Sequence, residues 1–466
     1  MNAREALAVK TRLFVPETND DETGAAIRPE SDVEGALAKN PTESNLALAF
    51  THRMQGRLLY CAEFGGWLEW SGTHWRRDKV RRAYNYCVRF ARALPTGGKS
   101  AGRASFAKGV ETIASAEPAF ARTIDQFDQD RDLIATPAGT INLRTGVMNP
   151  ARPEDMISRC TAASPENGRP KAWLQFLAWA LDGDQERIDF LQEFIGYSLT
   201  GHTGAEVFVY FDGPGGNGKG CITNTLRLIA GDYYHGAPAN LLLYSSLPQH
   251  PTSMAALNGK RIVVASELPV GARLDEQRLK MVTGQDPVCA RFMNRDETTF
   301  MPELKLMIAA NHQPRIIRPD AAMHRRLRVI SMPHVAENPN PALKNVILPA
   351  EAGQIFAWAI EGAARILARG EVFNTPEKVL EDSQRYLGSQ DSLGLFINER
   401  CDLNPSIHYP RTGLYDAYRE WADESGEFFT MAAREFYAEL EGRGLKPATY
   451  SGVRSLKGIA LKGQQR

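Results

Sequence analysis

The chain has 466 residues, 43% of them hydrophobic and 24% charged, and its 55 basic side chains balance its 55 acidic ones. This composition predicts a folded protein of two to four domains, and a net charge of zero means that any nucleic-acid site has to be a local basic patch. Six single cysteines without a CxxC pair predict neither a zinc site nor a disulfide framework, which fits a reducing cytoplasm, and no apolar run of membrane-spanning length occurs.

Residues 1–45 are polar and acidic, so we expect an arm without fixed structure there. An α+β region is expected over residues 46–170, with β-hairpins at 58–78 and 133–155 and helices over 79–125. The first hairpin is rich in tryptophan, and its rings either stack on nucleic-acid bases or fill a small core; we favour the core. These tryptophans are Trp67, Trp70 and Trp75.

An α/β nucleotide-binding core is predicted over residues 171–340, and it opens with a helical segment at 172–200. The apolar stretch VFVYF (207–211) predicts a buried strand, and GPGGNGKG and a helical pattern follow it directly. Strand, glycine-rich turn, lysine and helix together predict a loop whose N–H groups bind phosphate, with Lys219 as the point charge for the β- and γ-phosphates. The predicted ATP-binding residues are Gly213, Pro214, Gly215, Gly216, Asn217, Gly218, Lys219, Gly220 and Cys221.

The phosphate-binding pattern departs from its usual form at Gly220, where a Ser or Thr hydroxyl normally ligates Mg²⁺. Residues 231–258 predict mostly loop, and the apolar strand RIVVAS follows and leads into Glu267. An acid at that position would orient the attacking water and help to hold Mg²⁺, although Ser266 stands where a second acid is usual. Glu267 is therefore the predicted catalytic acid and metal ligand.

Two further strands complete the predicted core. The strand over 304–311 ends on Asn311, which is either a residue that senses the γ-phosphate or an ordinary turn residue. The strand over 327–332 follows Arg325 and Arg326, which either form a solvated face or reach the nucleotide of a neighbouring subunit. Between the strand that leads into Glu267 and the strand over 304–311 lies a predicted hairpin at 286–302, with Arg295 near its tip and Arg291 on one arm, as DNA contacts.

Amphipathic helices are predicted over residues 341–400, and a winged-helix domain over 401–466, with two helices followed by a β-ribbon. No acid occurs after Glu441, whereas several lysines and arginines do. This segment is either a DNA-binding surface that includes Arg454 and Lys457 or a solvated tail, and we favour DNA binding.

The ordered set GPGGNGKG, VVASEL, RLKMVTGQDPVCARFMNRDETTF, IAANHQPRI and HRRLRVI resembles the superfamily 3 helicase module of phage and plasmid primase-helicases, which are relatives of the poxvirus primase-helicase. The resemblance covers about residues 55–400. It implies an AAA+ P-loop ATPase that forms a hexameric ring, uses ATP and Mg²⁺, and moves 3′ to 5′ on single-stranded DNA at forked duplexes.

The same resemblance implies roles for individual residues: Lys219 on phosphate, Glu267 as the catalytic acid, Asn311 as the sensor, Arg325 or Arg326 as an arginine finger acting in the next subunit, and the 288–300 hairpin on DNA. It also implies phage or plasmid replication in a bacterial cytoplasm. No acidic polymerase motif is seen, so we expect a helicase without its own primase domain, with a separate primase or polymerase as a possible partner. Two alternatives stay open: an ATP-switched initiator that melts DNA without processive unwinding, and a small-molecule kinase, which would need no sensor asparagine.

Overall fold

The computed structural model describes residues 41–94, 101–245, 252–291, 297–317, 319–425 and 431–463. It divides into two compact units, Met1–Ser164 with Ala230–Asp232 and Pro165–Ile229 with Tyr233–Arg466. Most of the expected arm lies outside the described residues, but a helix already begins at Glu43, where the Thr42 hydroxyl accepts a hydrogen bond from the Asn45 N–H and caps the helix. Among the described helices, none combines the length and the apolar character that crossing a membrane requires.

The first unit contains two antiparallel three-stranded sheets, β1-β2-β3 and β4-β5-β6, so each predicted hairpin is confirmed and gains a third strand. Three helices pack with the first of these sheets around one apolar core. The elements are α3 (Glu43–Met54), β1 (Leu58–Cys61), β2 (Gly66–Trp70), β3 (Trp75–Arg77), α4 (Arg82–Arg92), α6 (Ala104–Ser115), β4 (Leu133–Thr136), β5 (Gly139–Asn142) and β6 (Val147–Asn149).

The tryptophans of the first sheet belong to the interior rather than to a surface platform. Trp67 is 8% exposed and Trp75 is 2% exposed, and the Trp75 indole N–H donates to the Pro153 carbonyl at 2.8 Å. Trp70 lies against Trp75, with 5.5 Å between ring centroids. The core interpretation is therefore correct for Trp67 and Trp75, because buried rings have no free face on which a base could stack, whereas Trp70 is half-buried.

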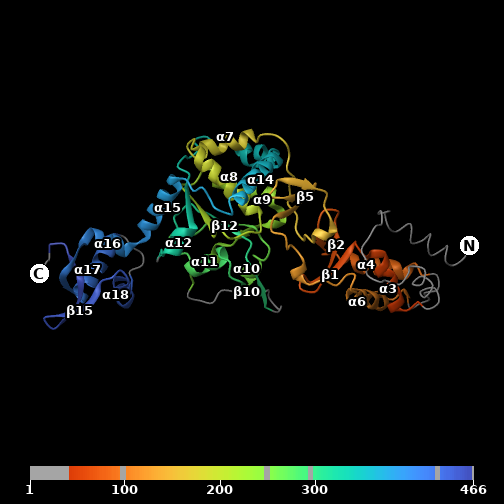
Figure 1. Ribbon diagram of the computed structural model, residues 1–466, viewed down its shortest axis with the longest axis horizontal. Coiled ribbons are helices and arrows are strands. Elements are labelled where there is room, and N and C mark those ends of the chain that lie inside the picture. Colours follow the sequence, from red (N-terminus) through yellow and green to blue (C-terminus); the bar gives the residue numbers. More distant parts are fainter. Residues whose placement is uncertain are drawn as a thin grey trace, which may run out of the picture. The chain divides into compact units, whose positions relative to one another are not determined.

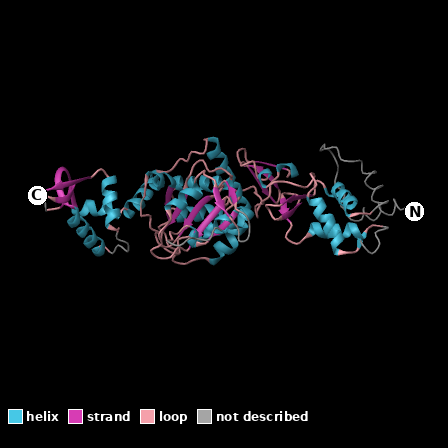
Figure 2. Ribbon diagram, turned by 90° about the horizontal axis from the view of Figure 1, so that it is seen from below, coloured by secondary structure: helices cyan, strands magenta, loops and turns pink. Residues whose placement is uncertain are grey.

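The second unit is built on a five-stranded parallel sheet in the order β13-β7-β12-β9-β8. The inner strands are almost wholly buried, as expected for parallel strands covered on both faces. Figure 2 shows these strands surrounded by helices. The strands are β7 (Phe208–Asp212), β8 (Tyr234–Ala237), β9 (Ile262–Ser266), β12 (Lys305–Ala309) and β13 (Leu327–Ser331).

Strand β8 corrects the prediction of mostly loop over residues 231–258. Its sequence, YHGA, has neither an apolar run nor an alternating pattern, so its strand state comes from pairing with β9 at the sheet edge. The three predicted strands that follow the glycine-rich turn are confirmed as β9, β12 and β13, although β12 ends at Ala309, two residues before Asn311.

Helices α8 and α14 lie side by side next to this sheet (Figure 1). Their close approach needs glycine on both helices, because a Cβ on Gly196 would lie 2.2 Å from the Ala363 nitrogen and one on Gly362 would lie 2.3 Å from the Gln192 oxygen. The helices of this part are α7 (Lys171–Ala180), α8 (Gln185–Leu199), α9 (Lys219–Ala230), α10 (Thr252–Ala255), α11 (Glu276–Thr283), α12 (Ala321–Arg326), α13 (Leu348–Ala350), α14 (Ala352–Ala368) and α15 (Glu377–Gln390).

The C-terminal residues of the same unit have their own apolar core, which runs from Leu393 to Ile459. The predicted helix pair and β-ribbon are confirmed, and the structure adds a helix and a strand before them. The three strands pair in the order β14-β16-β15. This C-terminal module comprises α16 (Ser392–Arg400), β14 (Cys401–Pro410), α17 (Arg411–Glu424), α18 (Ala433–Gly442), β15 (Lys446–Tyr450) and β16 (Val453–Leu461).

Candidate functional site

The order of the parallel strands predicts a ligand-binding crevice between the carboxyl ends of β7 and β12. The chain leaves β7 toward β8 at one edge of the sheet, whereas it leaves β12 toward β13 on the opposite side of β7. In open α/β sheets, ligands bind outside the carboxyl ends of two neighbouring strands whose connections diverge in this way. The glycine-rich turn leaves the carboxyl end of β7 at this crevice, and Asn311 follows the carboxyl end of β12.

The glycine-rich turn is attached to the end of β13. The Asn217 side-chain amide is buried and donates to the Met332 carbonyl at 2.9 Å, while the Met332 N–H donates to the Asp212 carbonyl at 2.8 Å. Gly213 has φ +139°, and a Cβ there would lie 2.4 Å from the Met332 oxygen. Only glycine fits at residue 213. The hydrogen bond of Asn217 to Met332 fixes the turn to the residue that follows β13.

Gly218 is the second position of the turn that requires glycine. Its φ is +95°, and a Cβ would lie 2.5 Å from Cε2 and 2.8 Å from Cζ of the Phe176 ring on α7. The aromatic residues of the segment before β7 thus support the turn directly. The sequence predicts burial of Phe176 but does not show that it packs against the glycine.

Lys219 begins α9 and is only 5% exposed, with its ammonium inside the turn. Its Nζ donates to the Gly213 carbonyl at 2.5 Å and to the Pro214 carbonyl at 3.1 Å. Burial lowers the pKa of this ammonium, and the nearby Asp212 carboxylate partly opposes the shift. A buried cation at the start of a helix, inside a turn of small residues, fits a phosphate group, which needs positive charge and convergent N–H donors.

Three polar residues lie near the crevice from neighbouring strands. The Asn311 Oδ1 lies 4.0 Å from the position that a Cβ of Gly215 would take, so the structure brings the predicted sensor to the turn. Asp212, at the end of β7, accepts hydrogen bonds from the Tyr210 hydroxyl and from Gln313 Nε2, each at 3.1 Å. The sequence reasoning missed Asp212 and Gln313, although an acid as the last residue before the turn was a readable signal.

Glu267 follows β9 directly and is exposed at the same edge of the sheet. Ser266 pairs with Ala309, which pairs with Phe211, so Glu267 is level with Asp212 two strands away, a separation of about 10 Å between strands. Its backbone is left-handed, with φ 60°, which is unfavourable for a non-glycine residue and is typical of functional positions.

The metal chemistry of this edge follows from its carboxylates. Among the described residues there is no group of three or more His, Cys, Asp or Glu side chains that could hold a metal ion. Mg²⁺ is commonly held by one or two carboxylates together with substrate phosphates, and Glu267 and Asp212 fit that mode. Gly220 contributes no hydroxyl, and burial raises the pKa of the Cys221 thiol, which keeps it protonated.

The two predicted finger arginines differ in their surroundings. Arg326 donates to Glu206 at 2.5 Å and is mostly buried, whereas Arg325 is exposed. Both precede Leu327, which pairs with Phe208 at the amino end of β7. The glycine-rich turn is at the other end of that strand, about 13 Å away at 3.3 Å per residue, so both arginines lie far from the turn of their own chain.

The predicted hairpin over 286–302 is confirmed in its arms, β10 (Val288–Ala290) and β11 (Thr298–Phe300), which pair antiparallel. Arg291 follows β10 and is exposed. Arg295, the predicted tip residue, lies outside the described residues.

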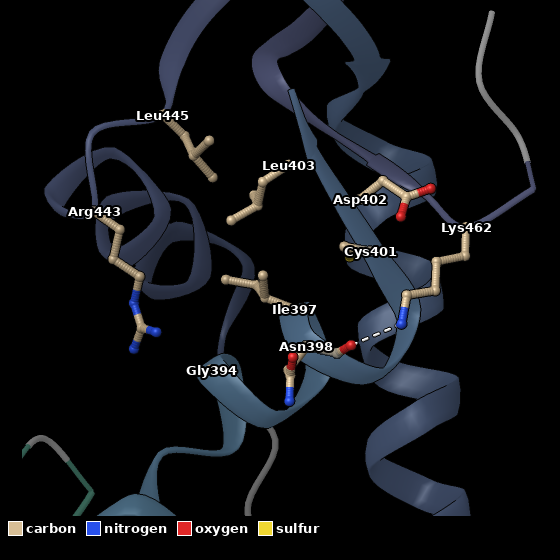
Figure 3. Close-up of a pocket in the computed structure, with 9 residues that line it drawn as sticks. All are labelled: Gly394, Ile397, Asn398, Cys401, Asp402, Leu403, Arg443, Leu445 and Lys462. Atoms are coloured by element: carbon tan, nitrogen blue, oxygen red, sulfur yellow. Dashed lines mark hydrogen bonds between the residues drawn. The ribbon is translucent and has the colours of Figure 1, made fainter. Parts of the chain in front are cut away.

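The basic positions of the C-terminal module lie on β15 and β16. Lys457 pairs with His408 on one side and Lys446 on the other, so the three residues form one row across the sheet. Arg454 is exposed and pairs with Thr449. A separate hollow of about 530 Å³ lies at the start of β14, where Figure 3 shows the Lys462 ammonium directed at the Asn398 carbonyl, 2.8 Å away.

The described residues thus form an α/β core with a parallel sheet, in which a glycine-rich turn and a buried lysine occupy the crevice between two diverging strands. Models of known families match three parts of the chain: "D5 N terminal like" at residues 47–182, "Family of unknown function (DUF5906)" at 211–326, and "Poxvirus D5 protein-like" at 389–443. The two D5 matches, at the N-terminal and C-terminal parts of the chain, confirm the resemblance to relatives of the poxvirus primase-helicase.

Two viral proteins whose names begin with "Putative helicase" are similar in sequence. Protein L207/L206 of Acanthamoeba polyphaga mimivirus is 26% identical over 220 residues, which is 46% of this chain and 23% of that protein. Protein 022R of Frog virus 3 (isolate Goorha) is 23% identical over 339 residues, 66% of this chain and 32% of that protein. The chain therefore spans about a quarter to a third of the length of these relatives.

Among solved structures, the NrS-1 C terminal region aligns with a TM-score of 0.41 and 15% identity over 64% of this chain and 77% of that one. A second structure of the same region gives a TM-score of 0.41 and 16% identity over the same shares. Likeness at this level carries no argument about the site.

Proposed function

We propose that this chain is an ATP-dependent DNA helicase of the superfamily 3 type, acting in phage or plasmid DNA replication. The observation that carries the proposal is the buried Lys219 in a glycine-rich turn, with Asn311 beside that turn in the crevice. The matches to the D5 family models and the helicase names of the viral relatives support it.

Each polar residue of the crevice has a place in the proposed hydrolysis of ATP. The N–H groups of the turn and Lys219 bind the β- and γ-phosphates, and Glu267 orients the attacking water and accepts its proton. Asn311 contacts the γ-phosphate or that water. Glu267 and Asp212 are the residues that would hold Mg²⁺, which would supply positive charge to the phosphates.

The proposed assembly is a hexameric ring, since the exposed Arg325 is too far from its own turn to act there and fits an arginine finger for the next subunit. Arg326 is the weaker candidate because Glu206 already binds its guanidinium. Single-stranded and forked DNA are the proposed partners, held by the β10–β11 hairpin and by the C-terminal module. The element order of that module supports a winged-helix interpretation. A 3′ to 5′ direction, docking of a separate primase or polymerase, and action in a bacterial cytoplasm belong to the same proposal.

The test compares Glu267→Gln with Lys219→Ala. We expect the Gln variant to bind ATP with near wild-type affinity but to hydrolyse it at least 100-fold more slowly, because the amide cannot accept the proton of the water. The Ala variant should lose ATP binding, because it removes the buried cation of the turn. Binding of a fluorescent ATP analogue and phosphate release measure the two effects separately.

Near wild-type hydrolysis by the Gln variant would remove Glu267 from the catalytic role. Unwinding of a long forked duplex by the wild-type protein distinguishes a helicase from the initiator alternative. Hydrolysis with local melting but no long-range unwinding would favour the initiator.

A further inference from the structure

The first turn of α9 carries an unexplained feature at Gly220. The hydroxyl that normally follows the phosphate-binding lysine is absent, and the following Thr223 hydroxyl faces its own helix, 3.5 Å from the Gly220 carbonyl oxygen. The Cys221 and Ile222 N–H groups both donate to the Gly218 carbonyl, at 2.9 and 3.3 Å, so an anion at this turn would depend on charged side chains as well as on backbone donors. A second group near Gly220 would decide which ligand atoms the turn accepts.

The ammonium of Lys344 lies at that position. Its Nζ is 3.7 Å from the place that a Cβ of Gly220 would take, and Lys344 is far from α9 in the sequence. The contact is supported from the backbone, because the Asn224 side-chain amide, one helical turn after Gly220, donates to the Lys344 carbonyl at 3.4 Å. Both observations place the residue against the helix that begins with Lys219.

The charge of Lys344 is available for a ligand. The side chain is exposed, and among the described residues no carboxylate forms an ion pair with it. The ammonium also lies close enough to the Cys221 thiol to oppose, in part, the rise in its pKa that burial causes. A serine hydroxyl at residue 220 would ligate a metal ion, whereas an ammonium beside that position repels a metal ion and attracts phosphate oxygens.

We propose that Lys344 is a second phosphate-binding cation, which takes over part of the role of the missing hydroxyl and makes binding of a nucleoside triphosphate less dependent on Mg²⁺. This inference rests on the proposed function, because it assumes that the turn binds nucleotide phosphates. Lys219 neutralises the phosphates from inside the turn, and Lys344 does so from the outer side of the first helical turn.

The test measures the Kd of a fluorescent ATP analogue on the full chain, in Mg²⁺ and in EDTA. We expect Lys344→Gln to raise the Kd in EDTA about tenfold or more, which is the loss expected for one hydrogen bond to a charged group. Lys344→Arg should bind close to wild type, since it keeps the charge. Lys171→Gln, which neutralises another exposed lysine of the same unit, is the matched control and should leave the Kd unchanged.

A double variant tests whether a hydroxyl at residue 220 can replace the Lys344 ammonium. In Lys344→Gln with Gly220→Ser, the hydroxyl should restore binding in Mg²⁺ but not in EDTA, because it acts through the metal. Equal affinity of Lys344→Gln and wild type in EDTA, while Lys219→Ala loses binding, would overturn the inference and leave the proposed function intact. If the wild-type chain bound no nucleotide, the proposed function and this inference would both fail.

Discussion

Replacement of Gly218 by alanine tests whether the turn has the backbone and the neighbours described above. A non-glycine residue at φ +95° carries strain of about 1–3 kcal/mol. The new methyl group would also lie 2.5 Å from the Phe176 ring, and overpacking of this kind costs about 1–3 kcal/mol. We therefore expect a stability loss of about 2–6 kcal/mol in the second unit, together with weaker ATP binding.

Gly220→Ala is the matched control. Gly220 lies in the first turn of α9, and its Cβ would meet only the end of the flexible Lys344 side chain at an ordinary distance of 3.7 Å. Alanine in a helix is favoured over glycine, so this variant should gain about 0.5–1 kcal/mol. The two variants add the same methyl group two residues apart and are expected to have opposite effects.

Hydrogen exchange of β7 and α9 amides measures both variants locally, which matters because a chain of several units does not unfold in one step. Thermal denaturation and binding of an ATP analogue complement it. Unchanged protection and affinity in Gly218→Ala would refute the described turn. The same substitution in a Phe176→Leu background should lose only about half as much free energy of unfolding. That result would confirm that contact with the Phe176 ring causes part of the destabilisation.

Three further predictions concern the sensor, the finger and the C-terminal module. Asn311→Ala should bind ATP with a Kd within about threefold of wild type but hydrolyse it roughly 10–100-fold more slowly. The reason is that it removes one hydrogen bond, worth roughly 1.5–3 kcal/mol, that positions the reacting end of the nucleotide. Equal loss of binding and hydrolysis would contradict a sensor role. Arg325→Ala should reduce ATP hydrolysis about 10³-fold and regain activity when it is mixed with Lys219→Ala protein. Arg326→Ala should mainly lower the melting temperature, because it leaves the Glu206 carboxylate without its ion-pair partner. The reverse pattern would make Arg326, not Arg325, the finger. Lys457→Gln should weaken DNA binding and lower the slope of log K against log salt by about 0.7–0.9, and an unchanged slope would remove that residue from the phosphate contacts.

The backbone conformation of Glu267 bears on its proposed catalytic role. Its left-handed backbone strains a non-glycine residue, at a cost of about 1–2 kcal/mol in folding free energy. The Glu267 side chain is exposed and fills no core, so packing does not explain the strained backbone. Strained residues of this kind are concentrated at functional sites. This argument is independent of the sequence pattern that first indicated Glu267.

The sequence alone was sufficient for features that depend on neighbouring residues. The apolar runs predict three further strands after the glycine-rich turn, and the glycines, Lys219 and the helical pattern predict the turn between strand and helix, because strand burial and turn geometry follow from residues a few positions apart. Strand β8 was missed because its state depends on pairing with β9 rather than on its own composition.

Only the tertiary structure decided which distant residues meet. Strand order places Asn311 beside Gly215, and the packing of α7 places Phe176 against Gly218. The pairing of Arg326 with Glu206, which distinguishes it from Arg325, and the approach of Lys344 to Gly220 likewise join segments far apart in the chain. Such contacts depend on how the whole sheet and its helices pack, and hydrophobic periodicity reports only which face of each element is buried, not which residue lies opposite.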